Sequence, residues 1–565
     1  MLAGNRRRVA RGIRHCAACL CLLLTVAGKA RADASPDPGP ADANAAATTI
    51  LVPATVDIGN AVVGSITIDN GSIFDLDLPE EDKFFYRLAN KAHITTRPGV
   101  ISQQLLFSEG DTLTKTSLEE SERILRSNRY LQDAEIETVP RDDGAVDVLV
   151  HTTDVWTLVP TLSLSRSGGQ NSGGIGIKEM NLFGTGVDVE AKYKSDVDRD
   201  AMIFKFHDRQ LGDSWYSLSA VYAENSDGHT RFLDLGKPFY SLDSTGAHGI
   251  SVLDNDEVES LYSNGEVMSQ FRHEAQTLET YRGWSKGLSD GWARRLLVGV
   301  AYDDHHFNQV TDDPVPGAPI PDDRMLVYPF VGFELIEDRF EKTKNLHQIN
   351  RTEDQYLGTR IGARLGYAST AFGSDRNAWM FGATAQTGFG SSETRSLILS
   401  SALNARLEDD GLRNMTLDGA ATYFRRKSDR RLFYASLSGL YGHNLDLDNQ
   451  LLLGGDSGLR GYPLRYRDGD KAALLTIEQR YFTDWYPFRL FRVGGAVFFD
   501  MGKTWNSRYP AEQTDELLKD VGFGLRLGNT RSGQGRMTHI DVAFPLDGDD
   551  RISNVQFLVE VRKGF

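Results

Sequence analysis

The chain has 565 residues, 40% hydrophobic, 10% aromatic and 25% charged, so it is long enough for two or three domains and too apolar to be disordered. Its formal net charge is −16, the opposite of the balance expected for a nucleic-acid-binding protein. After the first thirty residues no run of about 18 apolar residues occurs, which excludes transmembrane helices. Transmembrane strands are not excluded, since they need only about ten alternating residues.

Residues 1–32 predict an export signal. A cluster of arginines precedes a short apolar stretch at 16–27 and the small-x-small triplet Ala30-Arg31-Ala32, so we expect cleavage before Asp33. The chain's three cysteines all lie in this segment: Cys16, Cys19 and Cys21. The mature chain then has no thiol, which excludes disulfides, cysteine–metal sites and cysteine nucleophiles and fits the bacterial envelope.

Residues 33–60 are expected to be a linker, and residues 61–154 a small α/β domain. Ser65–Ile68 alternates like a strand, residues 84–106 have helical patterns, and a second helix begins near Ser117, with Glu120 as its capping-box partner. A hairpin follows, with strands at 134–137 and 146–150. The order strand, helix, helix, strand, strand predicts a compact binding domain with no catalytic residues.

Residues 155–565 predict almost continuous strand. Period-two alternation is strongest at Tyr356–Tyr367, Val493–Gly502 and Val521–Gly528, where one face is apolar and the other is rich in glycine with charged residues. A soluble sandwich would carry Thr, Lys and Glu on the second face, and glycine packs poorly there. Apolar-out, polar-in alternation over this whole region therefore predicts an all-β transmembrane barrel, and strand-like runs number up to about twenty.

The final run has the pattern of a C-terminal barrel strand. Phe557, Val559, Val561 and the terminal Phe565 share one face, and bacterial outer-membrane barrels commonly end on an aromatic residue. Three tryptophans are expected to anchor the barrel in the membrane interfaces: Trp156, Trp485 and Trp505.

Four stretches resemble motifs of one family: residues 96–154, Asn181–Gly186, Leu459-Arg460-Gly461-Tyr462, and Phe498-Phe499-Asp500-Met501-Gly502. On these residues the chain, from about residue 61 to 565, resembles the BamA/TamA superfamily of outer-membrane assembly and translocation proteins. The resemblance implies one small α/β POTRA-like domain, then a surface-antigen-type barrel of sixteen strands, five of them after an inward-folded loop with the Arg-Gly-Tyr motif. The chain departs from the family in having a single such domain, an insert at 71–95, and more strand candidates than sixteen.

The charged residues of the two barrel motifs have opposite charges and could form an ion pair. Asp500 shares the inward face with Phe498 and Gly502, and glycine leaves room for a loop to approach. A guanidinium–carboxylate pair is planar and directional, so Arg460 bound to Asp500 would fix the loop, and Glu478 on the next strand is a second acceptor. The alternative is that Arg460 and Asp500 are separate charges in the lumen.

Two other motifs suggest chemistry. Gly455-Asp456-Ser457-Gly458 is similar to the serine-nucleophile loop of trypsin-like proteases, but a triad also needs a base and an acid, and the stretch runs directly into Leu459. Asp303-Asp304-His305-His306 has metal-ligand residue types, but adjacent strand residues point to opposite faces. We therefore expect no enzyme activity, no metal and no cofactor.

Two classes of function remain. In the first, an insertase or translocase, the periplasmic domain captures unfolded outer-membrane or secreted proteins by strand addition, and the outer-membrane barrel opens between its first strand (about 155–168) and its last (about 554–565), or passes the chain through its lumen. Its partners would be these clients, outer-membrane lipid and periplasmic accessory subunits, with no nucleic acid. The alternative is a passive pore or surface antigen. The POTRA-like domain together with the Arg460–Asp500 pair favours the first.

Overall fold

A computed structural model of the protein describes residues 61–310, 319–507, 516–533, 537–549 and 552–562. The predicted signal peptide, the predicted linker and Phe565 lie outside the described residues. The described residues belong to one compact unit, Asp57–Phe565. None of its described helices has the length and apolar character needed to cross a bilayer.

A small α/β domain comes first. Its sheet has the order β1-β3-β2, with β1 (Val63–Gly71) parallel to β3 (Val146–Asp154), which is antiparallel to β2 (Leu131–Pro140). Three helices lie between β1 and β2 in the chain: α2 (Phe84–Ala92), α3 (Pro98–Ser102) and α4 (Lys115–Arg126). The fully buried Ile101, Leu125 and Val150 belong to the domain core, which joins helices to sheet. The predicted strand–helix–helix–strand–strand order is present, with the predicted helical region 84–106 divided into α2 and α3.

The predicted capping box of α4 is wrong by one turn. Thr114 is the N-cap; its Oγ1 accepts a hydrogen bond from the backbone N–H of Ser117 (3.0 Å), and the Ser117 Oγ accepts one from the N–H of Thr114 (3.2 Å). A capping box joins the N-cap to the third helical residue, and the helix begins at Lys115. Glu120 is therefore inside the helix, where its carboxylate accepts from the backbone N–H of Leu242 (2.8 Å).

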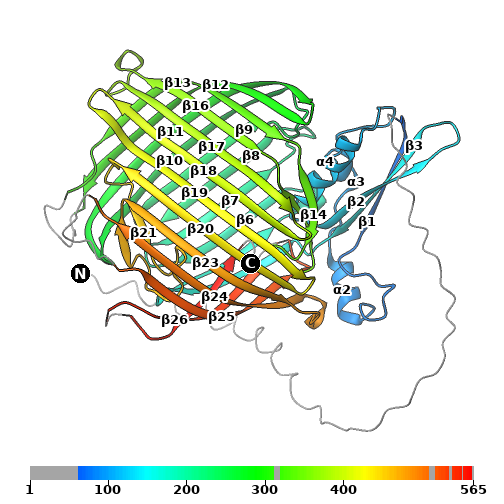
Figure 1. Cartoon of the computed structure of the whole chain (residues 1–565). Coiled ribbons are helices and arrows are strands. Elements are labelled where there is room, and N and C mark those ends of the chain that lie inside the picture. The colour runs from blue at the N-terminus through cyan, green and yellow to red at the C-terminus, as the bar shows by residue number, and fades with distance from the viewer. Residues whose placement is uncertain (1–60, 311–318, 508–515, 534–536, 550–551, 563–565) are drawn as a thin grey trace, which may run out of the picture. The chain divides into compact units, whose positions relative to one another are not determined.

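The rest of the described chain forms a closed barrel of twenty strands, each paired with its neighbours in chain order (Figure 1). All the pairs are antiparallel. The strands are β4 (Leu158–Ser167), β5 (Gln170–Glu179), β6 (Asp188–Ser195), β7 (Asp200–Asp208), β8 (Ser217–Asn225), β9 (Gly228–Lys237), β10 (Gly246–Ser263), β11 (Glu266–Ser289), β12 (Trp292–Gln309), β13 (Arg324–Glu337), β16 (Arg360–Ala368), β17 (Ala378–Ser391), β18 (Arg395–Glu408), β19 (Gly411–Ser428), β20 (Arg431–His443), β23 (Lys471–Phe482), β24 (Phe491–Trp505), β25 (Leu518–Asn529), β26 (Met537–Pro545) and β27 (Gln556–Arg562). We call the end where β4 follows the α/β domain the domain end, and the opposite end the distal end.

The expectation of sixteen strands is wrong, and the larger number counted from the alternation is confirmed. Five barrel strands, β23 to β27, follow the loop that carries Arg460, so the additional strands precede it. Motifs that cover a few residues say nothing about hairpins elsewhere. The number of alternating stretches and closure of the sheet decide how many strands the barrel has.

A band of exposed apolar side chains surrounds the barrel. Val497 on β24 and Phe523 on β25 are exposed, whereas Phe498, Asp500 and Arg526 on the alternate face are buried. Nearly every strand contributes to this band: Leu162, Ile175, Phe204, Leu233, Val252, Leu278, Leu296, Val331, Ile361, Phe381, Leu399, Leu417, Leu437, Val497, Phe523, Ile540 and Phe557. A surface of this kind belongs in lipid, as in an outer-membrane barrel.

The last strand has the predicted orientation. Phe557 and Val561 are 58% and 43% exposed, Val559 is half-buried on the same face, and Leu558 is buried. Trp485 and Trp505 are also exposed, at the domain end and the distal end of the β23–β24 region respectively. The outward apolar face of the C-terminal strand is therefore present up to Arg562.

The predicted strand Tyr356–Tyr367 is interrupted. Tyr356 ends β15 (Thr352–Tyr356), which pairs only with β14 (Phe340–Lys344) within the described chain, and the wall strand β16 starts at Arg360. The backbone N–H groups of Leu357 and Gly358 both donate to the carbonyl of Arg339 (3.0 and 3.1 Å), which turns the chain between the two strands. The apolar–polar alternation of the sequence continues through the break because Leu357, an apolar residue, is completely buried in the turn.

Candidate functional site in the barrel lumen

Residues 444–470 at the distal end form a long segment that folds into the barrel; we call it the lumen loop. It carries the short strands β21 (Leu451–Leu453) and β22 (Arg467–Gly469), which pair with each other. Leu459 and Tyr462 are completely buried and pack with Leu453, Tyr466 and Leu518. Burial of these large apolar side chains holds the loop inside the wall.

The lumen loop is fixed to the wall by Arg460. Its Nε and Nη2 donate to the two carboxylate oxygens of Asp500 on β24 (2.6 and 2.9 Å), and its Nη1 donates to Oε1 of Glu478 on β23 (2.8 Å). All three side chains are at least 94% buried. The guanidinium also stacks on Phe498, 3.4 Å from the ring centroid. The contact predicted between Arg460, Asp500 and Glu478 is therefore present.

The neighbours of Arg460 make their own contacts with the wall. The backbone N–H of Gly461 donates to Asp520 (3.0 Å), and a Cβ at Gly461 would lie 2.6 Å from the Cβ of Asp520, so only glycine fits. The Tyr462 hydroxyl donates to the carbonyl of Lys519 (2.8 Å). Gly502 leaves the space that Leu459 fills, since an added Cβ would lie 3.3 Å from it. The Leu459–Tyr462 motif of the loop thus packs directly against the Phe498–Gly502 motif of the wall.

Several residues of this network were missed by the sequence reasoning. Arg480 donates through Nε to Oε2 of Glu478 (2.9 Å), and Arg526 pairs with Asp541, which lies 3.7 Å from Arg460. They could have been found from their positions along the strands, because residues two apart point to the same face. Arg480 lies two residues after Glu478, and Arg526 lies on the glycine face of β25, so both point inward.

The lumen loop also touches the turn that follows the first wall strand. Gly168, which lies between β4 and β5 and has φ +53°, is so close to the loop that an added Cβ would lie 2.1 Å from the backbone nitrogen of Leu464. Gly455 approaches the same turn, where its Cβ would be 2.7 Å from the nitrogen of Gly168. One loop therefore contacts both β4 and the β23–β26 wall.

The described parts of the last and first strands share few residue pairs. Among the described residues, which end at Arg562, the register of β27 and β4 contains one residue pair, Val559 with Arg166. By comparison, β26 and β27 have seven pairs and β4 and β5 have ten. Because inter-strand hydrogen bonds hold a sheet together, this seam needs the fewest broken bonds of any place in the described wall.

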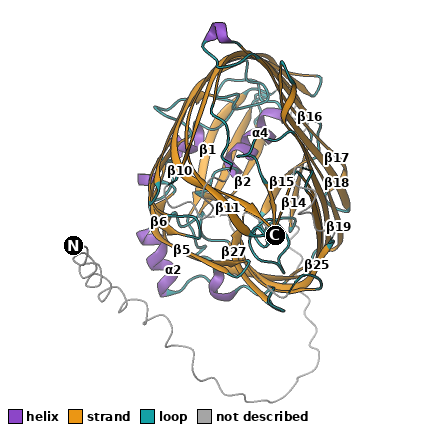
Figure 2. Cartoon of the chain, turned by 90° about the vertical axis from the view of Figure 1, so that its left-hand side faces the viewer, coloured by secondary structure: helices purple, strands orange, loops and turns teal. Residues whose placement is uncertain are grey.

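A second segment enters the barrel from the domain end. Residues 340–356, with β14 and β15, form what we call the inner hairpin, and Figure 2 looks into the barrel and shows both strands within the outline of the wall. Its tip residues Leu346 and Ile349 are buried against Phe424, Leu432 and other wall residues. The carbonyl of Leu346 accepts a hydrogen bond from Nη1 of Arg480 (3.0 Å). The inner hairpin and the lumen loop are thus joined through β23.

The tip of the inner hairpin is organised by one carboxylate. Oε1 of Glu353 accepts from the backbone N–H of Leu346 (2.9 Å), and Oε2 accepts from that of His347 (2.9 Å). Burial raises the pKa of Glu353, against the effect of these hydrogen bonds. Burial, together with the positive charge of Arg480, lowers the pKa of His347 to about 4. His347 is therefore neutral near pH 7.

The inner hairpin also binds the α/β domain. Nε and Nη2 of Arg126 on α4 donate to the two carboxylate oxygens of Asp354 (2.8 and 2.7 Å), and Glu122 one turn earlier pairs with Lys342. The Thr352 hydroxyl donates to Asp133 at the start of β2 (2.7 Å). Hydrogen bonds and ion pairs therefore run from the α/β domain through the inner hairpin to the lumen loop.

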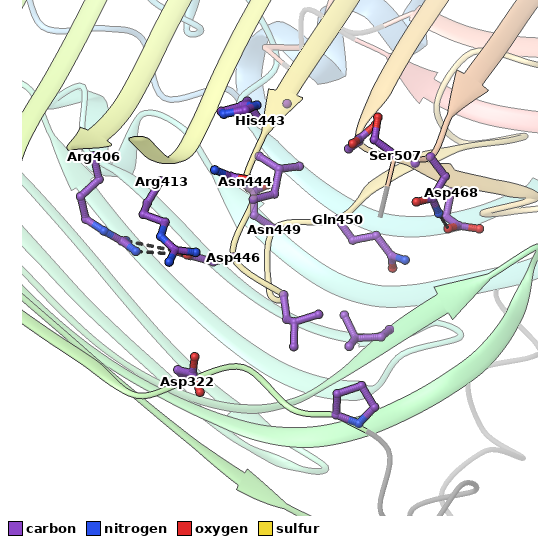
Figure 3. Close-up of a pocket in the computed structure, with 18 of the residues that line it drawn as sticks. Asp322, Arg406, Arg413, His443, Asn444, Asp446, Asn449, Gln450, Asp468 and Ser507 are labelled. Carbon is purple, nitrogen blue, oxygen red and sulfur yellow. Dashed lines mark hydrogen bonds and ion pairs between the residues drawn. The ribbon is translucent and has the colours of Figure 1, made fainter. Parts of the chain in front are cut away.

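A polar cavity of about 780 Å³ lies at the distal end, between the lumen loop and the wall (Figure 3). Figure 3 shows Arg406 directed toward Asp446 of the loop, and their two hydrogen bonds measure 3.0 and 3.1 Å. The cavity wall also contains Arg324, which pairs with Asp448 (2.6 Å). Both charge signs occur and pair with each other, as in a water-filled vestibule.

The Gly455–Gly458 motif belongs to the lumen loop. Ser457 makes a turn: its Oγ accepts from the backbone N–H of Gly454 (2.7 Å). In the part of the chain that the structure describes, no group of three or more His, Cys, Asp and Glu side chains is arranged to hold a metal ion.

No protein-family profile matches the chain, and no curated protein matches it. Among solved structures, BamA from Haemophilus ducreyi lacking POTRA domains 1–3 is 12% identical, with a TM-score of 0.39, covering 89% of this chain and 84% of that one. CdiB from Escherichia coli is 14% identical, with a TM-score of 0.44, covering 88% and 76%. The FrpB iron transporter from Neisseria meningitidis is 9% identical, with a TM-score of 0.36, covering 77% and 78%.

Proposed function

We propose that the protein is an outer-membrane insertase or translocase of the BamA/TamA type, which assembles or exports polypeptide clients without covalent chemistry. The observation that carries the proposal is the seam between β27 and β4, with its single residue pair in the part of the chain that the structure describes. A client strand that pairs with the free edge of β4 or β27 would replace few existing hydrogen bonds. The predicted signal peptide supports a location in the bacterial envelope, and we infer that the α/β domain lies in the periplasm as a POTRA-like domain.

The lumen loop supports the proposal because it joins the wall strands β23 and β24 to the turn after β4, the first strand of the seam. Arg460 holds it to β23 and β24, and Gly455 and Leu464 lie against the turn after β4. A simple pore needs no such buried charge pair. We infer that the loop keeps β4 in place until a client arrives.

Client capture would begin at the α/β domain, on a strand edge. Along β2, however, the carbonyl of Ala134 accepts from Nη1 of Arg126 (2.8 Å), and the N–H of Ile136 donates to Glu122 (2.9 Å). These side chains occupy the edge of β2 near the barrel. Strand addition at β2 would therefore begin beyond Ile136, toward the tip of the β2–β3 hairpin.

A disulfide across the seam tests the function. The cysteine-free mature chain allows Arg166→Cys and Val559→Cys to be combined, and the control pair Ile540→Cys with Val559→Cys joins β26 to β27 at a register pair of the ordinary wall. We expect the seam disulfide, verified by mass spectrometry, to deplete clients from the outer-membrane or secreted proteome, and the control disulfide to leave them unchanged.

The proteome also separates the subclasses. Loss of several barrel proteins identifies an assembly factor, and loss of one exported protein identifies a dedicated transporter. An unchanged proteome with a fully formed seam disulfide would contradict the proposal. The passive pore would then be tested by conductance in planar bilayers.

A further inference from the structure

Helix α2 presents its apolar residues to the outside. Phe84, Phe85 and Leu88 are 72%, 76% and 51% exposed, and no residue of the helix is buried. We call these three residues the aromatic edge of α2. They occupy positions i, i+1 and i+4, so they form one stripe along the helix. A water-facing helix of a small domain normally shows the reverse pattern, with its apolar stripe against the core.

The opposite face of α2 fixes its orientation. Tyr86 stacks on Phe74 with 4.4 Å between ring centroids, and Asn90 exchanges two hydrogen bonds with the backbone of Phe74 (3.0 and 2.8 Å). His93, just after the helix, lies 2.8 Å from the Asp154 carboxylate. Rotating the aromatic edge inward would break all these contacts, so its exposure is built into the domain.

The aromatic edge continues an apolar rim of the barrel. The Tyr86 hydroxyl donates to the carbonyl of Phe488 (3.0 Å), and Glu80 pairs with Arg489. This turn, between β23 and β24 at the domain end, carries Trp485 and Phe488, which are 65% and 76% exposed. Figure 1 shows α2 beside the ends of these two strands. Aromatic residues at this level of a membrane barrel sit among lipid headgroups.

We propose that α2 is a membrane-surface anchor whose aromatic edge enters the phospholipid leaflet at the domain end of the barrel. Phe84, Phe85 and Leu88, together with Trp485 and Phe488, make one apolar surface continuous with the lipid-facing wall. An interfacial helix of this type buries its apolar face at the boundary of headgroups and acyl chains. The partner of the aromatic edge is lipid because this surface adjoins the lipid-facing wall of the barrel. The anchor does not depend on whether the protein handles clients.

Site-specific fluorescence tests the anchor. The full-length mature chain with Phe85→Cys, labelled with the environment-sensitive dye NBD, is reconstituted in vesicles of phosphatidylethanolamine and phosphatidylglycerol. Val139→Cys is the matched control, because Val139 is an exposed apolar residue (52%) of the same domain near the tip of the β2–β3 hairpin. We expect a blue-shifted emission at position 85 and at least twofold stronger quenching there by nitroxide-labelled lipids than at position 139.

Two outcomes would overturn the anchor. Equal, weak quenching at both positions would show that the aromatic edge is in water. Lipid quenching that stays weak while an added synthetic peptide of alternating apolar and polar residues shields the dye would show that the edge binds polypeptide. Leu88→Cys is measured in parallel, as a second label position on the same edge. The heat-modifiable migration of the barrel on gels confirms that each variant is folded, so that a perturbation by the label at Phe85 is recognised.

Discussion

The guanidinium of Arg480 donates a hydrogen bond to the carbonyl of Leu346 (3.0 Å), so that strand β23 holds the tip of the inner hairpin. The same guanidinium donates to Glu478, which also accepts from Arg460 of the lumen loop. Two segments that enter the barrel from opposite ends are therefore linked through Arg480 and Glu478 of β23. Because the inner hairpin binds the α/β domain through Arg126, a movement of that domain is mechanically connected to the lumen loop.

Removing the ion pairs of Arg460 should leave a folded barrel with a mobile lumen loop. Arg460→Ala leaves the buried Asp500 and Glu478 carboxylates without their main partner, a loss of roughly 3–5 kcal/mol for a buried pair. We expect faster protease cleavage within 444–470 and reduced client output. Arg465→Ala, in the same loop but in a more exposed pair with Asp198, is the control, and equal protection in both variants would contradict this role for Arg460.

Shortening the inner hairpin should open the lumen from the domain end. Replacing residues 345–350 with Gly-Gly removes Leu346 and Ile349 from the wall cluster. We expect single-channel conductance in planar bilayers to rise several-fold. Replacing Glu393 and Thr394, in a neighbouring turn at the same end, with glycine should leave the conductance unchanged. An unaltered conductance in the shortened variant would show that the hairpin does not restrict the lumen.

The contact between the α/β domain and the barrel should weaken when Asp354 is replaced. Asp354→Ala removes two charged hydrogen bonds from Arg126, which keeps Glu122 and the Ala134 carbonyl, so we expect a cost of about 2 kcal/mol. Spin labels on domain and barrel should then report a broader distance distribution. Asp82→Ala breaks the exposed pair with Arg87 and should change nothing measurable.

The inner hairpin should loosen in acid because of His347. Its pKa is about 4 in the folded chain and about 6.5 in an unfolded one, so the unfolded hairpin binds the proton first. The stabilisation is complete above pH 6.5 and is lost as the pH falls from 6.5 to 4. Protection of residues 345–353 against hydrogen exchange should drop over this range. Glu353 has a raised pKa and acts in the opposite direction, so the comparison is with His347→Gln, which should lack the step.

Much of the candidate site could be predicted from local patterns. The shared inward face of Phe498, Asp500 and Gly502 follows from their spacing on a strand, and Gly502 indicated the close approach of a loop. Arg480 faces inward two residues after Glu478, but its second partner, the carbonyl of Leu346, comes from a loop far away in the chain. No spacing within one segment shows which inward charges meet across a lumen.

The sequence alone determined that the chain is a barrel with an apolar outside, because two-residue alternation is a local property that lipid and backbone hydrogen bonding convert into strands. It also predicted the ion pair between Arg460 and Asp500. Only the tertiary structure decided between sixteen and twenty wall strands, and only it revealed the single described residue pair of the seam at Val559 and the departure of residues 340–356 from the wall into the lumen. These features depend on closure of the sheet and on contacts between distant segments, and neither is encoded in any one stretch of residues.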